Sequence, residues 1–306
     1  EVAKNINSNV FYLAAREDSG HISNRSQAIR KIIAEHPNQP IIGNLVFGSK
    51  SGIKDDLEII DEFKEGIMWV VDMCQFRTDT VLIHSMLDKG VMLMVTGSKF
   101  YQSPPFCGAL LVPKSWTEKI CNNDASIIKG YEELFSAYDF PESCTEIRKQ
   151  LSDEINLGLR MRWEIAIEEM KAYLAFPSIE SNALIRRWNQ VVTGRLAQSD
   201  YFQLMPNMEL TNDSIVSFMV LANGKPLNNE GLKKLFDYLV LNEHEGLNGF
   251  KKVFLGQPVQ YGEKSFIRFA IGSYSIRRQL ANKRFLPQND IKLIEIIENA
   301  VDILFP

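Results

Sequence analysis

Two short stretches of the sequence carry the side chains best suited to chemistry. Asp72 and Gln75 follow one apolar run and offer a carboxylate and an amide. Thr96, Ser98 and Lys99 follow another apolar run and offer two hydroxyls and a primary amine. If the two runs are neighbouring parallel strands, these groups leave the same edge of a sheet, which is where open α/β sheets bind their ligands. The spacing therefore predicts one site built from both stretches.

Together these residue types favour one kind of chemistry. The amine of Lys99 can form an imine with a carbonyl carbon, and the hydroxyls of Thr96 and Ser98 can bind a phosphate. The carboxylate of Asp72 can keep a pyridine nitrogen protonated, and a protonated pyridine makes pyridoxal phosphate an electron sink. Gln75 can donate an amide hydrogen bond to a ring oxygen. Asp72 alone would more often be a helix cap, so the prediction depends on the combination.

The rest of the first half predicts the elements that position these residues. Strand-like runs cover residues 9–15, 40–48, 67–72, 91–96 and 108–112. Helical patterns separate them at residues 26–35, 53–64 and 80–89, and Gly90 follows the last where a C-cap glycine is expected. Strands that alternate with helices predict an α/β domain with a mostly parallel sheet and flanking helices.

The sequence changes character near Trp116. Residues 116–207 are charged and helix-periodic, and one long helix is predicted over residues 154–173. From Ser214 onward the sequence predicts strands at residues 215–221 and 266–272, and helices at residues 229–241 and 289–304. We therefore expect a partial large α/β domain over residues 1–115, a helical connector over 116–207 and a small C-terminal α+β domain over 208–306.

Composition argues against several other classes of protein. The 306 residues are 45% hydrophobic, with a net charge of −4 and an isoelectric point near 5.7, so there is no basic footprint for nucleic acid. A run of about 18 apolar residues, which a membrane span needs, is not present. The four cysteines form no C-x-x-C pair, so we expect reduced thiols in a cytoplasmic protein. The four histidines show no pair at ligand spacing, so no metal site is expected.

The five residues at the two strand ends resemble the site of the fold-type I pyridoxal-phosphate (PLP) enzymes. Within that group they are most similar to the class V aminotransferases, which include cysteine desulfurases and kynureninase. The resemblance implies PLP as the cofactor, with Lys99 as the internal-aldimine lysine and Asp72 as the partner of the pyridinium nitrogen. It also implies that Gln75 lies near the phenolic oxygen and that Thr96 and Ser98 bind the phosphate. A homodimer is implied as well.

The similarity covers residues 9–113 and includes three further segments. The run from Pro104 to Leu111 follows the lysine as it does in the family. The segment from Gly48 to Gly52 stands where the family has a strand-end loop, and the segment from Arg16 to Gly20 resembles its acidic-glycine turn. The sequence of residues 43–51 is also similar to a Walker A loop. Ser49, however, separates Gly48 from Lys50, so the lysine is one position out of register, which disfavours an NTPase.

Arg268 is the candidate residue of the second half. Residues 256–259 and 265–269 resemble the family's loop and strand that present an arginine to the substrate carboxylate. A guanidinium inside an apolar strand needs an anionic partner, and a carboxylate fits its planar fork. An internal salt bridge with Glu263 is the alternative. The loop before Arg268 contains no cysteine, which disfavours a cysteine desulfurase.

Two elements of the family site have no counterpart in this sequence. They are the phosphate-binding loop and the aromatic or histidine that stacks on the cofactor ring, and both precede the first strand recognised here. Because the sequence begins at Glu1, we expect a further N-terminal segment or a separate chain to complete the site. The prediction is a PLP-dependent enzyme that acts on a small amino acid, as an aminotransferase or a lyase, through Lys99. The alternative is a non-catalytic relative or fragment that binds a partner.

Overall fold

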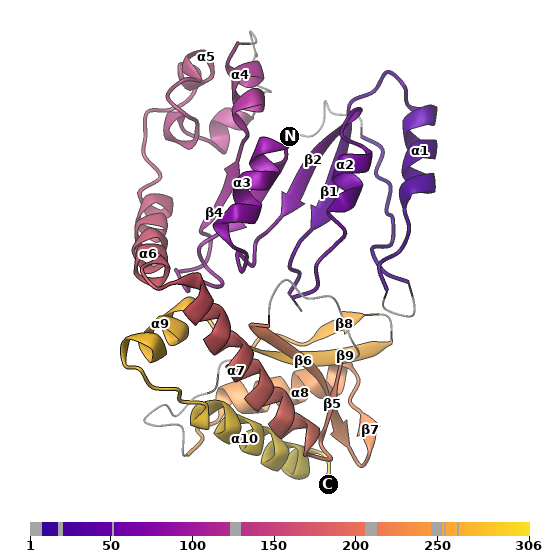
Figure 1. The fold of residues 1–306 in the computed structure, drawn as a ribbon, viewed down its shortest axis with the longest axis vertical. Helices are drawn as coiled ribbons and strands as arrows, with labels where there is room; N and C mark the ends of the chain where they lie inside the picture. Colours follow the sequence, from indigo (N-terminus) through magenta and orange to yellow (C-terminus); the bar gives the residue numbers. More distant parts are fainter. Residues whose placement is uncertain are drawn as a thin grey trace. The chain divides into compact units, whose positions relative to one another are not determined.

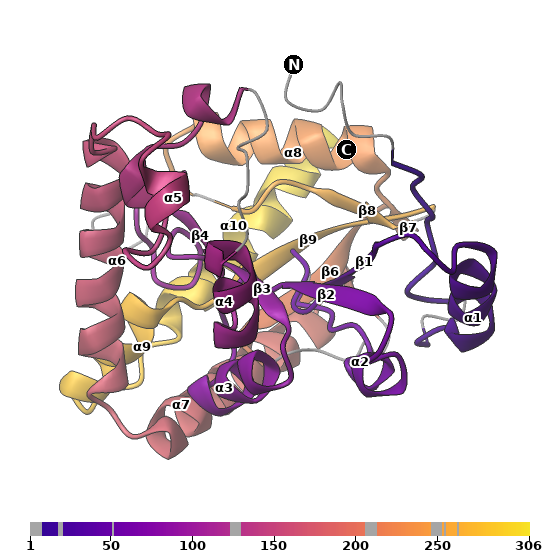
Figure 2. The same cartoon turned by 90° about the horizontal axis from the view of Figure 1, so that it is seen from above.

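The computed structural model describes residues 8–17, 21–50, 52–122, 130–205, 213–245, 253, 255–261 and 263–306. The chain forms two compact units, shown in Figure 1 and from a second direction in Figure 2. The first unit contains residues 1–47, 55–99 and 103–167, and the second contains residues 48–54, 100–102 and 168–306. The predicted helical connector is therefore divided between the two units.

A four-stranded sheet forms the centre of the first unit, in the order β1-β2-β3-β4. The strands β1 (Ile41–Val46), β2 (Ile67–Asp72) and β3 (Met92–Thr96) are parallel, as predicted. The fourth strand, β4 (Gly108–Leu111), is antiparallel to β3. The loop between β3 and β4 contains no helix that could carry the chain back across the sheet, so β4 returns in the opposite direction.

The helices of this sheet begin and end largely where the sequence predicts. They are α1 (Ser26–Glu35), α2 (Glu58–Glu62) and α3 (Thr80–Asp88). The Asp79 side chain caps α3 by accepting from the Leu82 N–H at 2.8 Å, and Gly90 follows with a φ of 83°. The helix α2 is shorter than predicted and begins after Asp55, whose carboxylate forms a buried ion pair with Arg25 at 2.6 Å.

The predicted strand at residues 9–15 is wrong. Within the described residues 8–17, the only ladder contact is an isolated bridge between Arg16 and Ile22. The side chains of Val10 and Tyr12 are 65% and 92% exposed, so this apolar run is not buried in the described part of the chain. Apolar composition predicts a strand only where another strand is available to pair with it.

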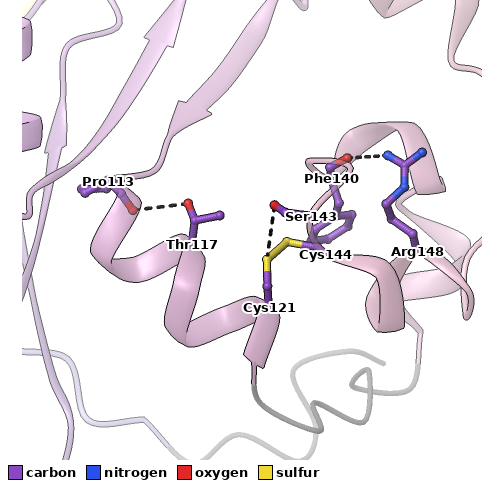
Figure 3. Close-up of a disulfide and its surroundings, with 7 residues drawn as sticks. All are labelled: Pro113, Thr117, Cys121, Phe140, Ser143, Cys144 and Arg148. Atoms are coloured by element: carbon purple, nitrogen blue, oxygen red, sulfur yellow. Dashed lines mark hydrogen bonds between the residues drawn. A yellow bond between two sulfur atoms is a disulfide. The ribbon is translucent and has the colours of Figure 1, made fainter.

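The remaining elements of the first unit are helical. They are α4 (Lys114–Asn122), two 3₁₀ turns (Tyr131–Glu133 and Ala137–Asp139), α5 (Thr145–Arg148) and the first part of α6 (Leu157–Leu174). Figure 3 shows that Cys121, near the end of α4, forms a disulfide with Cys144, which precedes α5. The prediction of reduced thiols is therefore wrong for this pair, whereas Cys74 and Cys107 are free. Spacing could not reveal the pair because packing of two short helices brings it together.

The second unit contains an antiparallel sheet in the order β5-β6-β9-β8, with β7 paired to β6. Its strands are β5 (Phe202–Leu204), β6 (Ile215–Ala222), β7 (Lys225–Pro226), β8 (Val259–Tyr261) and β9 (Lys264–Ala270). The strands predicted at 215–221 and 266–272 are confirmed within two residues. Asn223 and Gly224 have positive φ angles of 50° and 72°, which suits the two-residue hairpin between β6 and β7.

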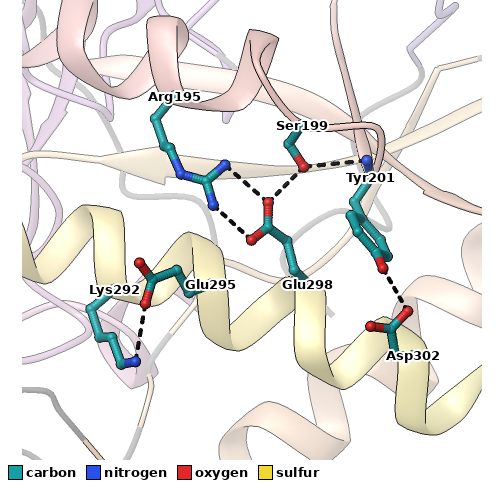
Figure 4. Close-up of polar contacts among 7 residues, drawn as sticks. All are labelled: Arg195, Ser199, Tyr201, Lys292, Glu295, Glu298 and Asp302. Carbon is teal, nitrogen blue, oxygen red and sulfur yellow. Dashed lines mark hydrogen bonds and ion pairs between the residues drawn. The ribbon is translucent and has the colours of Figure 1, made fainter.

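Helices α7 (Ser178–Ala197), α8 (Asn229–Leu241), α9 (Ser273–Ala281) and α10 (Gln288–Leu304) accompany this sheet. The helix α7 packs against β5 and β6, and α8 packs against β9. Figure 4 shows the hydrogen bonds between α10 and the end of α7. The Glu298 carboxylate accepts from both Nη atoms of Arg195, at 2.9 and 2.7 Å, and from Ser199 Oγ at 2.6 Å. Among the described residues, no helix combines the length and apolar character that a membrane crossing needs.

Candidate functional site

The end of β2 presents the carboxylate of Asp72. Asp72 is the last residue of this strand and lies opposite Met94 of β3. Its Oδ1 accepts a hydrogen bond of 2.8 Å from the Cys74 backbone N–H, and the Met73 N–H donates to the Met94 carbonyl at 2.8 Å. Asp72 therefore closes the turn after β2 with one oxygen, and this bond orients the carboxylate. Gln75 follows and is buried.

The end of β3 is a closed turn that leads to Lys99. The Thr96 hydroxyl is buried, donates to the Cys107 carbonyl and accepts from the Ser98 backbone N–H at 3.2 Å. The Thr96 and Ser98 hydroxyl oxygens also lie 2.9 Å apart. The Gly97 N–H donates to the Cys107 carbonyl at 3.0 Å. These bonds define the position of Ser98 and leave the Lys99 side chain exposed.

The helix α6 packs directly onto this turn. A Cβ atom on Gly97 would lie 2.4 Å from the Ala166 Cβ and 3.1 Å from the Cys107 Sγ. Ser103 holds the same helix, since its Oγ donates to the Arg162 carbonyl at 2.7 Å. Cys107 is 1% exposed and packs here as a small buried residue. Only glycine fits between Thr96 and Ser98 while α6 keeps this position.

Cys74 reports on the electrostatics of both strand ends. The pKa of its thiol is raised to about 11, by burial first and then by the hydrogen bond to Asp72 and the charge of that carboxylate, whereas the charge of Lys99 lowers it. One thiol thus lies within electrostatic reach of both charged groups. The sequence prediction missed Cys74, although its place between Asp72 and Gln75 was a usable signal.

The other predicted segments are placed as follows. Arg268 lies in β9 of the second unit, and its Nη1 donates to the Gln257 carbonyl at 3.1 Å. In the strand-end loop after β1, the N–H groups of Gly48 and Ser49 both donate to the Ile53 carbonyl, at 3.1 and 2.9 Å, while Ser51 lies outside the described residues. In the predicted acidic-glycine turn, residues 18–20 also lie outside them. Within the described residues, no group of three or more His, Cys, Asp or Glu side chains is arranged to hold a metal ion.

Comparison with known proteins gives no sequence relative but clear structural ones. No family model and no curated protein sequence matches the chain. Among solved structures, it is similar to 4-hydroxyphenylacetaldehyde synthase of Rhodiola rosea, with a TM-score of 0.55, 16% identity, and coverage of 99% of this chain and 59% of the other. It is also similar to alanine–glyoxylate aminotransferase of Nostoc sp., with a TM-score of 0.53, 16% identity, and coverage of 87% and 64%.

A third structure is that of Oryza sativa TDC with PLP and tryptamine, with a TM-score of 0.52, 12% identity, and coverage of 92% and 55%. The chain thus spans between 55% and 64% of the length of these proteins. This chain combines a mostly parallel sheet with flanking helices in its first unit and an antiparallel sheet with helices in its second. By this architecture, the chain has the fold of the fold-type I PLP-dependent enzymes.

Proposed function

We propose that the protein is a PLP-dependent enzyme that acts on a small amino acid, by aminotransferase or lyase chemistry. The observation that carries the proposal is geometric: Asp72 and Thr96 end neighbouring parallel strands, and the turn after Thr96 leaves the Lys99 amine exposed. The structural relatives support the cofactor and the substrate class, since one was solved with PLP and tryptamine and another is an alanine–glyoxylate aminotransferase.

The residues at the two strand ends fit PLP chemically. Lys99 offers an exposed primary amine to the aldehyde carbon, and the oriented carboxylate of Asp72 would keep the pyridine nitrogen protonated. Gln75 would donate its amide to the phenolic oxygen. Bound PLP would supply an electron sink for a carbanion at the substrate α-carbon.

The hydroxyls of Thr96 and Ser98 have different roles in the proposed phosphate site. Thr96 already donates its proton to the Cys107 carbonyl and accepts from the Ser98 N–H, so its hydrogen-bonding capacity is largely used within the turn. We propose that the Ser98 hydroxyl turns its proton from Thr96 Oγ1, 2.9 Å away, to the phosphate, and that Thr96 holds the Ser98 backbone N–H in place. This assignment keeps both residues in the cofactor site with different tasks.

Substrate handling is assigned to two further groups. The Lys99 amine, once the substrate amine has taken its place, would move the proton at the substrate α-carbon. Arg268 would bind the substrate carboxylate, because a planar guanidinium makes paired hydrogen bonds with a carboxylate. The charge of Arg268 would in this way select amino acids over simple amines.

Assembly and location complete the proposal. We propose membership of the class V aminotransferase group, a homodimer, and a further N-terminal segment or chain that supplies the remaining cofactor contacts. A cytoplasmic location stays a prediction, and the Cys121–Cys144 disulfide weighs against it because disulfides are rare in reducing compartments.

The central assignment is tested by trapping the cofactor. The protein is incubated with PLP, reduced with borohydride and digested, and mass spectrometry locates the reduced pyridoxyl group. We expect it on Lys99, together with a visible absorbance band that Lys99→Ala abolishes. Lys114→Ala is the control, since the Lys114 side chain is exposed and lies on α4. Binding without a Lys99 adduct would instead favour the non-catalytic alternative.

A further inference from the structure

The Arg268 guanidinium lies against a loop of its own unit. In β9, Arg268 is opposite Ser217 of β6, and on the other side β9 pairs with β8, where Val259 is opposite Phe266. Extending that antiparallel register by two residues brings Gln257 level with Arg268. The hydrogen bond from Arg268 Nη1 to the Gln257 carbonyl, 3.1 Å long, agrees with this register. Sheet pairing therefore holds the loop beside the arginine.

Gly256 is the residue that gives the guanidinium its space. A Cβ atom on Gly256 would lie 2.8 Å from Nη2, 2.9 Å from Cζ and 3.2 Å from Nε of Arg268. All three atoms belong to the guanidinium, and all three distances are shorter than ordinary contacts between non-bonded atoms. Any side chain at this position would therefore displace the charged group. Because the group ends a flexible side chain, the arginine would move and the backbone would not need to.

Backbone conformation does not account for this glycine. Gly224 in the hairpin has a φ of 72°, which favours glycine, but Gly256 does not have a positive φ. Other residues could adopt the backbone conformation of Gly256 without strain. A side chain at residue 256 would instead be opposed by the guanidinium of Arg268, which occupies the space that its Cβ atom would take.

We propose that Gly256 is a positioning residue which, with the Gln257 carbonyl, sets the place and orientation of the Arg268 guanidinium for a substrate carboxylate. The inference rests on the proposed function, in which Arg268 binds that carboxylate. Paired hydrogen bonds to a carboxylate need the planar guanidinium in one orientation. A guanidinium that is shifted or rotated would keep its charge and lose this alignment, so residue 256 would control carboxylate affinity without touching the substrate.

Side-chain NMR of the full chain tests the position and the binding together. The protein is labelled with ¹⁵N-arginine, and the Nε–H signal of Arg268 is identified by its loss in Arg268→Lys. We expect Gly256→Ala to shift this signal. Acetate is the carboxylate probe, and we expect Gly256→Ala to raise the acetate concentration for half-saturation by about tenfold, the effect of a misaligned charge-assisted bond.

Gly194→Ala is the matched control, because a Cβ atom on Gly194 of α7 meets nothing within 4 Å. It should leave both the signal and the acetate titration unchanged. If Gly256→Ala leaves the Arg268 signal and the titration as they are in the unmodified protein, the positioning proposal is overturned. If Gly256→Ala shifts the signal but acetate moves it in neither protein, the positioning stands and the carboxylate role assigned to Arg268 fails.

Discussion

The Cys74 backbone N–H donates a 2.8 Å hydrogen bond to Asp72 Oδ1, and the Cys74 side chain lies in the field of the same carboxylate. One residue thus orients the carboxylate through its backbone and responds to it through its thiol. This makes Cys74 a natural probe of the candidate site, since its titration depends on charges from both strand ends.

The first prediction concerns the ionisation of Cys74. Its pKa is raised to about 11, by burial first and then by the hydrogen bond and charge of Asp72. We expect Asp72→Asn to lower this pKa, because a neutral amide no longer opposes the thiolate, and Lys99→Ala to raise it, because a favourable positive charge is removed. The pH dependence of iodoacetamide alkylation, followed on the Cys74 peptide by mass spectrometry, measures both changes. Equal profiles in all three proteins would show that neither charge reaches the thiol.

The second prediction concerns the packing of α6 on the lysine turn. Gly97→Ala would place a Cβ atom 2.4 Å from the Ala166 Cβ, so we expect the free energy of unfolding to fall by about 1–3 kcal/mol, the usual effect of overpacking. Urea unfolding measures the loss. In an Ala166→Gly background the loss should shrink, because the colliding atom is gone. Losses of equal size in the two backgrounds would contradict the contact, and Gly194→Ala serves as the helix control.

The third prediction concerns Asp290, in the first turn of α10. Burial raises the pKa of its carboxyl to about 6, above the ordinary value of 3.8. The folded state therefore binds a proton more tightly than the unfolded state, and stability should fall as the pH rises from about 4 through about 6. Asp290→Asn should remove this part of the pH dependence. Chemical unfolding at a series of pH values tests the point, and a slope that survives the substitution would assign it to other groups.

The fourth prediction concerns the disulfide of the first unit. Cys121 and Cys144 are 23 residues apart, and opening a loop of this size lowers stability by about 3 kcal/mol in the chain-entropy description. We expect dithiothreitol to lower the melting temperature of the unmodified protein. Cys121→Ser should melt at the lower temperature with or without the reductant. If dithiothreitol changed both proteins alike, the effect would lie elsewhere.

The sequence by itself determined the local elements and the residue types of the candidate site. The strands β2 and β3 and the helix α8, predicted and found at residues 229–241, follow from hydrophobic periodicity over a few neighbouring residues. The placement of Asp72 and Thr96 as the last residues of two strands follows from the same local pattern. Such features depend on interactions between residues close in sequence, so they can be predicted from the sequence alone.

Only the tertiary structure decided the features that depend on distant partners. The sheet pairing turned β4 antiparallel and left residues 9–15 without a strand. Gly97 lies against Ala166, and Gly256 lies against Arg268, so a side chain at either glycine would collide with that neighbour. Neither contact can be read from the residues next to the glycine. The pairing of Cys121 with Cys144 arose in the same way. Contacts of this kind reflect how whole elements fill space together, and residue spacing along the chain carries no direct signal of them.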